Sequence, residues 1–227
     1  MGCNSSKSGD VKENKAAAPR ASEGAATSNS PNPVSETPQT KGAMKINGRA
    51  CFGAGCYWGT EKFFVYNFDK ENKDKGEISD GNVGFMGPDG APENPTYKEV
   101  CSGYTGHVEV FEFEYSGGLD YYEALVRFFF QFHDPTTLKR QGNDVGTQYA
   151  SVIYCSEDNE MEVCKKVISE LQKLIDDGKI TAYEGKKVTT DVRKRTKFFP
   201  AHKEHQDYLS ANPNGYCNHR IRFKEWP

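Results

Sequence analysis

The 227-residue chain has no apolar run near the roughly 20 residues needed to cross a bilayer, and its N-terminus lacks the apolar core of a secretory signal peptide. Basic residues are not in excess, since 29 Lys and Arg are interspersed with 32 Asp and Glu, so we expect no nucleic-acid partner. The seven cysteines are scattered and contain no CxxC pair. This spacing excludes a disulfide-stapled secreted fold, argues against a structural zinc site, and favours reduced thiols in the cytoplasm.

The first 44 residues contain almost no aromatic or branched apolar residues and are rich in Ser, Ala, Pro and Asn. Such a composition cannot bury enough apolar surface to offset the loss of chain entropy on folding. We therefore expect residues 1–44 to form a disordered tail and residues 45–227 to form one catalytic domain, which we expect to be a monomer.

The extreme N-terminus carries a possible lipid anchor. Its run Met1–Ser6 fits the N-myristoylation pattern, in which Gly2 becomes the first residue after Met removal and a hydroxyl residue stands at position 6. Because one myristoyl chain gives only marginal membrane residence, we expect a palmitoyl chain on Cys3 as the second signal. These two residues would hold the domain at the cytosolic face of a membrane; a chance match would leave it cytoplasmic.

Strand and helix patterns alternate from Gly48 onward. We expect strands at 50–54, 107–115, 148–154 and 187–193 and helices starting near residues 60, 120 and 156. Asp120 and Glu123 are the expected capping box of the second helix, while the polar stretch 69–82 and the turn residues 87–95 are expected loops. The fold class is α+β, a single two-layer domain with a mixed sheet packed against helices, ferredoxin-like in arrangement.

Cys56 stands between the first expected strand and the first expected helix. A helix N-terminus lowers the pKa of a thiol and so makes it nucleophilic, which marks Cys56 as the reactive cysteine. Tyr57 and Trp58 beside it would form an apolar wall suited to a small neutral group such as a methyl. Most free cysteines are instead buried structural residues. That interpretation is preferred for Cys51, Cys101, Cys155 and Cys164.

The run Gly55-Cys56-Tyr57-Trp58-Gly59 resembles the GCFWG signature of the peptide methionine sulfoxide reductase A family. Three further blocks resemble the same family in the same order: Asn94–His107, His133–Tyr149 and His205–Cys217. The resemblance spans roughly residues 50–217. It implies a thiol-dependent reduction of methionine S-sulfoxide, free and in oxidised proteins, and hence a role in repair of oxidative damage.

The resemblance also implies roles for single residues. Cys56 attacks the sulfoxide sulfur, Glu99 matches the family's proton donor, and Tyr149 and Asp144 match residues that bind the sulfoxide oxygen and organise the site. Cys217, in a Gly- and Asn-rich segment expected to be flexible, matches the resolving cysteine, which condenses with the Cys56 sulfenic acid to a disulfide. Thioredoxin is the implied reductant of that disulfide, and no metal or organic cofactor is implied.

Two positions depart from the family pattern. Tyr57 replaces the usual Phe and adds a hydroxyl to the methyl pocket, which needs a partner when buried. Phe85 stands where the family usually has Tyr and removes a hydroxyl near the substrate oxygen. We expect slower turnover from this second change, not loss of activity.

Two other classes of function stay open at this point. A cysteine hydrolase would pair Cys56 with a distant imidazole such as His107 or His205, although the sequence offers no oxyanion-hole motif. A redox sensor or sulfoxide-binding module would use the same pocket without turnover.

Overall fold

The computed structural model describes residues 48–227, so the expected tail with Gly2 and Cys3 lies outside the described residues. Strands are β1 (Gly48–Ala54), β2 (Glu77–Met86), β3 (Val108–Ser116), β4 (Arg140–Gln141), β5 (Asp144–Val145), β6 (Ser151–Cys155), β7 (Asp191–Lys194) and β8 (Phe198–Pro200). Helices are α1 (Tyr57–Lys62), α2 (Asp69–Asn72), α3 (Tyr97–Cys101), α4 (Gly118–Phe132), α5 (Asp158–Asp176) and α6 (Tyr208–Ala211). A π-helix η1 (Phe63–Phe68) joins α1 to α2, and short 3-10 turns are η2 (Thr147–Tyr149) and η3 (Lys203–His205).

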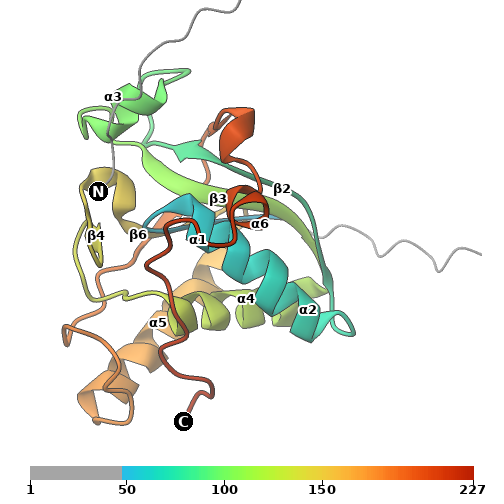
Figure 1. Cartoon of the computed structure of the whole chain (residues 1–227). Coiled ribbons are helices and arrows are strands. Elements are labelled where there is room, and N and C mark those ends of the chain that lie inside the picture. Colours follow the sequence, from blue (N-terminus) through green and yellow to red (C-terminus); the bar gives the residue numbers. More distant parts are fainter. Residues whose placement is uncertain (1–47) are drawn as a thin grey trace, which may run out of the picture. The chain divides into compact units, whose positions relative to one another are not determined.

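The described residues contain a six-stranded sheet in the order β7-β6-β1-β3-β2-β8 (Figure 1). All its neighbouring pairs are antiparallel except β6 and β7, which are parallel. Helix α1 follows β1 and helix α4 follows β3, so the helices arise from the connections between strands. The predicted mixed sheet with helices is confirmed. The ferredoxin-like arrangement stays a prediction, with which the strand order β6-β1-β3-β2 is consistent.

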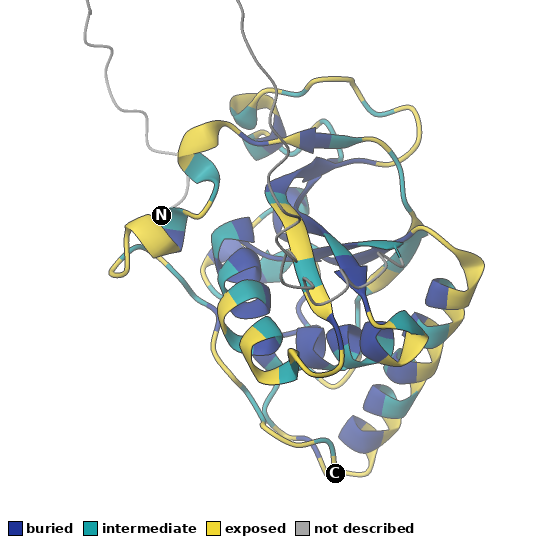
Figure 2. Cartoon of the chain, turned by 90° about the vertical axis from the view of Figure 1, so that its right-hand side faces the viewer, coloured by how far each residue is buried: buried dark blue, intermediate teal, exposed yellow. Residues whose placement is uncertain are grey.

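Alternate residues of β1 belong to two different apolar clusters, because successive side chains of a strand point to opposite faces of the sheet. Ala50, Phe52 and Ala54 join the main core with the aromatic side chains of η1 and α4, and Cys51 joins a smaller cluster on the other face. Phe52 stacks on Phe64 with ring centroids 4.8 Å apart. Helix α5 has buried residues on one side and exposed residues on the other, whereas α4 is buried or intermediate beyond its first turn (Figure 2).

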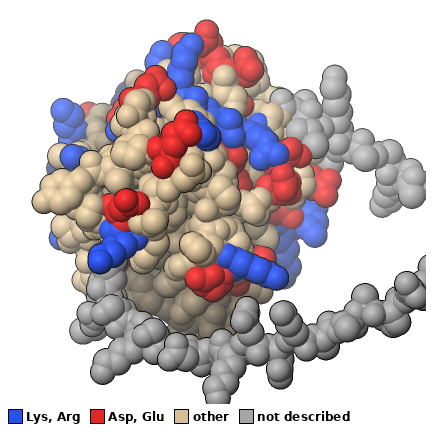
Figure 3. All heavy atoms as spheres, turned by 90° about the horizontal axis from the view of Figure 1, so that it is seen from above, with Lys and Arg blue, Asp and Glu red and all other residues tan. Residues whose placement is uncertain are grey.

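The surface carries charges of both signs. On the face shown in Figure 3, Lys and Arg side chains lie beside Asp and Glu side chains, in keeping with the interspersed charges of the sequence. Among residues 48–227, no helix combines the length and the hydropathy of a membrane span.

Several expected elements need correction. The stretch 69–82 is not a loop, because α2 continues the helix from η1 and β2 begins at Glu77, where its polar residues lie on the exposed end of the strand. Helix α4 begins at Gly118 after Gly117, which has φ +119°, so Asp120 and Glu123 form no capping box. Glu123 instead binds Arg127 and Lys166.

Other elements agree with the sequence more closely. Helix α5 is confirmed with a capping box formed by Glu157 and Glu160 and with Gly178 just beyond it at φ +69°. Strand β3 is confirmed, but Glu112 on its second face is buried and paired with Arg195 rather than solvated. Strands β6 and β7 are shorter than expected, since 147–149 form η2 and 187–190 lie outside β7.

Candidate active site

Cys56 lies at the turn between β1 and α1, as predicted. Gly55 has φ +96°, and a Cβ there would lie 2.5 Å from Cβ of Gln141, so only glycine fits before the cysteine. The Cys56 carbonyl accepts hydrogen bonds from the amides of Gly59 at 3.2 Å and Thr60 at 3.5 Å, which closes the first helical turn. The thiol accepts a hydrogen bond from the backbone N–H of Trp58 at the helix start, and 8% of the surface of Cys56 is exposed.

The electrostatics of Cys56 differ from the prediction. Burial raises the pKa of the thiol well above its ordinary value, Glu109 raises it further, and a hydrogen bond from the Trp58 backbone N–H lowers it. The helix N-terminus thus acts in the expected direction but is outweighed by desolvation. Cys56 rests as a protonated thiol rather than a thiolate.

Glu109, which the sequence analysis missed, is the carboxyl group beside this thiol. It lies on β3 with 1% of its surface exposed, and its Oε2 accepts a hydrogen bond of 3.2 Å from the backbone N–H of Tyr57. Burial raises the pKa of Glu109 to about 8, the Tyr57 bond lowers it, and Asp144 adds to the rise. Its carboxyl is consequently neutral at pH 7 and able to donate a proton.

A signal for Glu109 was present in the sequence. Glu109, Phe111 and Phe113 occupy alternate positions of β3, so their side chains point to the same face of the sheet. Phe111 and Phe113 belong to the core, and an acidic residue is unexpected on that face.

Glu99, the predicted proton donor, lies elsewhere. Its carboxylate accepts hydrogen bonds from the backbone N–H and the hydroxyl of Thr96, both at 2.7 Å, and so closes the capping box of α3. These bonds lower the pKa of the exposed Glu99 carboxyl. The assignment of Glu99 as the acid is wrong on physical grounds, because an ionised, solvated carboxylate has no proton to give at neutral pH.

Two tyrosines, Tyr97 and Tyr149, are coupled electrostatically to Glu109. Desolvation raises the pKa of Tyr149, and the charges of Glu109, Asp144 and Cys56 raise it further. Desolvation also raises the pKa of Tyr97, followed by Glu109 and Cys101. Tyr149 was predicted, whereas Tyr97 lies inside a matching motif but received no role. Both hydroxyls remain protonated donors at physiological pH.

The predicted aromatic wall is present beside Cys56. The Tyr57 ring lies 5.9 Å from the Phe85 ring and 6.2 Å from the Trp58 ring, and Trp58 stacks on Tyr208 of α6 at 3.8 Å. Within the described residues, the buried Tyr57 hydroxyl has no hydrogen-bond partner. The Trp58 indole N–H likewise has no partner there, so the wall is apolar apart from two unpaired polar groups, of which the replacement of Phe by Tyr57 introduces the hydroxyl.

Cys217 belongs to the C-terminal segment, residues 216–222, which returns to the site. Tyr216 Oη donates to Asp144 Oδ1 at 3.0 Å and Asn218 Nδ2 donates to Asp144 Oδ2 at 2.9 Å, so Asp144 binds the residues on both sides of Cys217. Cys217 packs against the apolar cluster that contains Cys56, and a charge on Cys217 would raise the pKa of Cys56. Both are free thiols.

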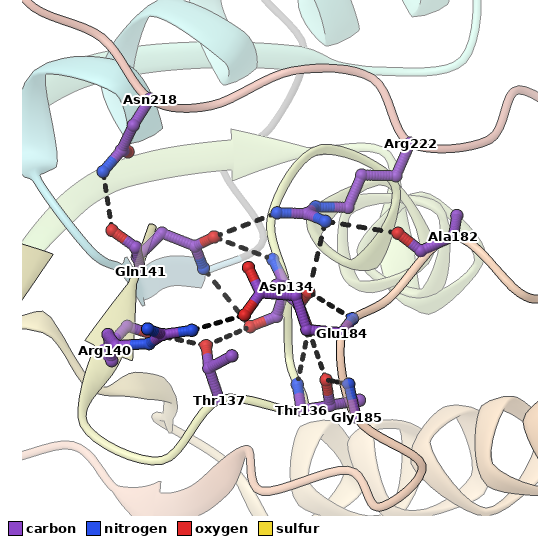
Figure 4. Close-up of polar contacts among 10 residues, drawn as sticks. All are labelled: Asp134, Thr136, Thr137, Arg140, Gln141, Ala182, Glu184, Gly185, Asn218 and Arg222. Carbon is purple, nitrogen blue, oxygen red and sulfur yellow. Dashed lines mark hydrogen bonds and ion pairs between the residues drawn. The ribbon is translucent and has the colours of Figure 1, made fainter. Parts of the chain in front are cut away.

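This segment is anchored, in contrast to the flexible chain that we expected. Arg222 Nη1 lies 3.1 Å from Asp134 Oδ2 in a buried ion pair and also donates to the carbonyl of Ala182 (Figure 4). Asn218 donates to the carbonyl of Gln141, and the backbone N–H of Arg222 donates to the carbonyl of Gln131. The anchors fix the chain on both sides of Cys217.

Neither histidine of the hydrolase alternative pairs with Cys56. His107 packs edge-on against Phe199, and within residues 48–227 neither of its ring nitrogens is hydrogen-bonded. His205 stacks on Trp58 at 5.6 Å and on Tyr97 at 5.2 Å. The imidazole beside a site thiol is His219, whose Nδ1 lies 3.9 Å from Cys217 Sγ.

Comparison with known proteins agrees with this geometry. The family model for peptide methionine sulfoxide reductase matches residues 48–226. Peptide methionine sulfoxide reductase MsrA of Nautilia profundicola is 41% identical over 170 residues, covering 74% of this chain and 87% of that protein. The human mitochondrial peptide methionine sulfoxide reductase is 44% identical over 169 residues, which are 74% of this chain and 65% of the human one.

Among solved structures, reduced Mxr1 from Saccharomyces cerevisiae superposes with a TM-score of 0.65 at 31% identity, over 80% of this chain and 98% of Mxr1. The family model covers nearly all of the described residues, and the sequence blocks around Cys56, Tyr149 and Cys217 fall inside it. The chain therefore belongs to the peptide methionine sulfoxide reductase family, whose members are oxidoreductases.

Proposed function

We propose that this chain reduces methionine S-sulfoxide, free and in oxidised proteins, to methionine, with Cys56 as the nucleophile. The observation that carries the proposal is the neutral carboxyl of Glu109, which is bonded to the N–H of the residue after Cys56. A sulfoxide oxygen leaves its sulfur only when it receives a proton, and a buried carboxylic acid with a pKa of about 8 holds that proton at pH 7.

The first step balances within the site. As the Cys56 sulfur attacks the sulfoxide sulfur, Glu109 gives its proton to the sulfoxide oxygen and takes up the proton of the Cys56 thiol. The attack forms a bond between the Cys56 sulfur and the sulfoxide sulfur. That S–S bond and the S–O bond to methionine then break as an S–O bond to Cys56 forms. Methionine sulfur is reduced by two electrons, Cys56 sulfur is oxidised by two, and the products are methionine and a Cys56 sulfenic acid.

The surroundings suit this substrate. Tyr97 and Tyr149 carry hydroxyls that can donate to the sulfoxide oxygen, because burial raises the pKa of both and keeps them protonated. Tyr57, Trp58 and Phe85 supply the apolar contact for the methyl group. The hydroxyls of the two tyrosines can thus replace the one that Phe85 lacks. Glu109, rather than Glu99, is the proton donor in this proposal.

The second step regenerates the site. Cys217 condenses with the Cys56 sulfenic acid to form a disulfide and water, and thioredoxin then reduces that disulfide. The anchoring of the residues on both sides of Cys217 by Asp144 supports its role as the resolving thiol, because the attack needs a fixed approach.

A single-turnover experiment without reductant tests the proposal. Purified protein mixed with excess methionine S-sulfoxide should release about one methionine per chain, with the Cys56→Ser variant releasing none. Glu109→Gln should lower the rate of methionine release by about 10²- to 10⁴-fold, the usual contribution of a general acid. Release at the wild-type rate from Glu109→Gln would remove the proposed proton donor, and release from Cys56→Ser would remove the nucleophile.

A further inference from the structure

We propose that His219 is a catalytic residue of the second step, in which it accepts the thiol proton of Cys217 as that sulfur attacks the Cys56 sulfenic acid. The inference rests on the proposed function. Its first observation is the distance of 3.9 Å between Cys217 Sγ and His219 Nδ1, which is within hydrogen-bond range for sulfur. His219 follows Cys217 by two residues within the C-terminal segment, and 8% of its surface is exposed.

The tautomer of His219 is fixed by its other nitrogen. Nε2 lies 2.6 Å from the carbonyl oxygen of Ala54, the last residue of β1. A carbonyl oxygen only accepts hydrogen bonds, so Nε2 must carry the proton and Nδ1 must present its lone pair. That lone pair is the one directed toward Cys217, which makes the imidazole a proton acceptor for this thiol.

The imidazole is held rigidly against the helix that starts at Cys56. A Cβ on Gly59 would overlap His219 Nδ1, so the ring lies directly on the glycine backbone. The rings of Phe132 at 5.6 Å and Phe63 at 6.1 Å pack around it. His219 therefore links the resolving thiol to the strand end and the helix start that carry the nucleophile.

The ionisable groups around His219 are few. Cys217 and Arg222 belong to its own segment, and His133 comes from the end of α4. Burial lowers the pKa of His219 to about 4, the Ala54 bond raises it, and Arg222 lowers it. The ring thus stays a neutral acceptor across the physiological range and does not retain a proton it receives.

The step balances without an added reactant. Cys217 sulfur attacks Cys56 sulfur, the S–S bond forms, and the S–O bond of the sulfenic acid breaks. The Cys217 proton passes to His219 Nδ1 and from there to the departing hydroxide, which leaves as water. The neutral imidazole of His219 is a weak base, so its protonated form is a strong acid. The same ring that receives the proton therefore readily delivers it to the leaving group.

Two substitutions separate the roles of the two ring nitrogens. His219→Gln can place an amide N–H where Nε2 lies and keep the Ala54 bond, but it offers no base to Cys217. His219→Asn can place an amide oxygen where Nδ1 lies, which accepts a hydrogen bond from the thiol without being basic. His202→Gln is the matched control, since His202 is exposed.

Single turnovers with excess methionine S-sulfoxide are followed by methionine release, by dimedone trapping of the Cys56 sulfenic acid, and by loss of thiols as the disulfide forms. We expect both His219 variants to form the disulfide about 10²-fold more slowly than wild type at pH 7 and to accumulate trapped sulfenic acid. His202→Gln should match wild type. In His219→Gln the rate should rise more steeply between pH 6 and 8 than in wild type, because solvent must then take the Cys217 proton.

Equal disulfide rates in wild type and His219→Gln would overturn the assignment. Full activity of His219→Asn would also overturn it, because orientation of the thiol alone would then suffice. A wild-type protein that releases no methionine would overturn both this inference and the proposed function, whereas methionine release with unchanged disulfide rates would count against His219 alone.

Discussion

Replacement of Glu109 by Gln should stabilise the fold as it removes activity. Burial raises the pKa of Glu109 from 4.5 to about 8, so the folded protein holds a proton that the unfolded chain releases above pH 4.5. The native state then binds more protons than the unfolded state, and the free energy of unfolding falls as the pH rises until both states are ionised near pH 8.

The size of this effect follows from the two pKa values. At about 1.4 kcal/mol per pH unit, the interval from 4.5 to about 8 corresponds to about 5 kcal/mol lost by wild type. Glu109→Gln cannot ionise and avoids the loss. Relative to wild type, the variant should therefore gain about 4 kcal/mol in free energy of unfolding between pH 5 and pH 8.

Urea unfolding of both proteins at pH values from 5 to 8.5 measures this difference. Glu99→Gln is the matched control: its exposed carboxyl has a lowered pKa and is ionised in both states above pH 5, so its difference from wild type should stay constant. If the wild-type and Glu109→Gln stabilities ran parallel across this range, the buried neutral carboxyl, and the proton donor built on it, would be refuted.

Four further outcomes are expected. The rate of methionine release by wild type should fall on the alkaline side with an apparent pKa of about 8 as Glu109 ionises, which a single-turnover pH profile measures. Gly59→Ala should displace the His219 ring that its Cβ would overlap, and so slow disulfide formation in the thiol-loss assay. Arg222→Met should lower the free energy of unfolding by about 3–5 kcal/mol in urea, because it leaves a buried aspartate unpaired. Gly2→Ala should abolish the acylation that we propose, and the intact mass of the protein from its native cells should then lack a myristoyl group.

The strand-to-helix turn at Cys56 was predictable because a short apolar run, a glycine and a helical pattern follow each other without interruption. Strand β3 and helix α5 were likewise predictable, since both have strong apolar periodicity. Strand β2 was not, because its first half pairs at the exposed end of the sheet and carries polar residues. There the pairing with β3 outweighs the local preference for a loop.

The candidate site was predictable only in part. The motifs supplied Cys56, Tyr149 and Cys217, but the choice between two acidic residues depends on burial, which a motif does not report. Glu99 and Glu109 are ten positions apart, and the structure exposes the first and buries the second. The direction of the pKa shift of Cys56 was predicted wrongly for the same reason, because desolvation outweighs the helix N-terminus only once the fold covers the thiol.

The most direct test of the central claim is an epimer-resolved turnover assay. Purified protein is supplied with racemic methionine sulfoxide and dithiothreitol, and the two remaining sulfoxide epimers are quantified by chiral chromatography. The proposal predicts that the S epimer is consumed completely, that the R epimer remains, and that Cys56→Ser leaves both untouched. Persistence of the S epimer with folded wild-type protein would contradict the assignment of this chain as a methionine sulfoxide reductase acting through Cys56.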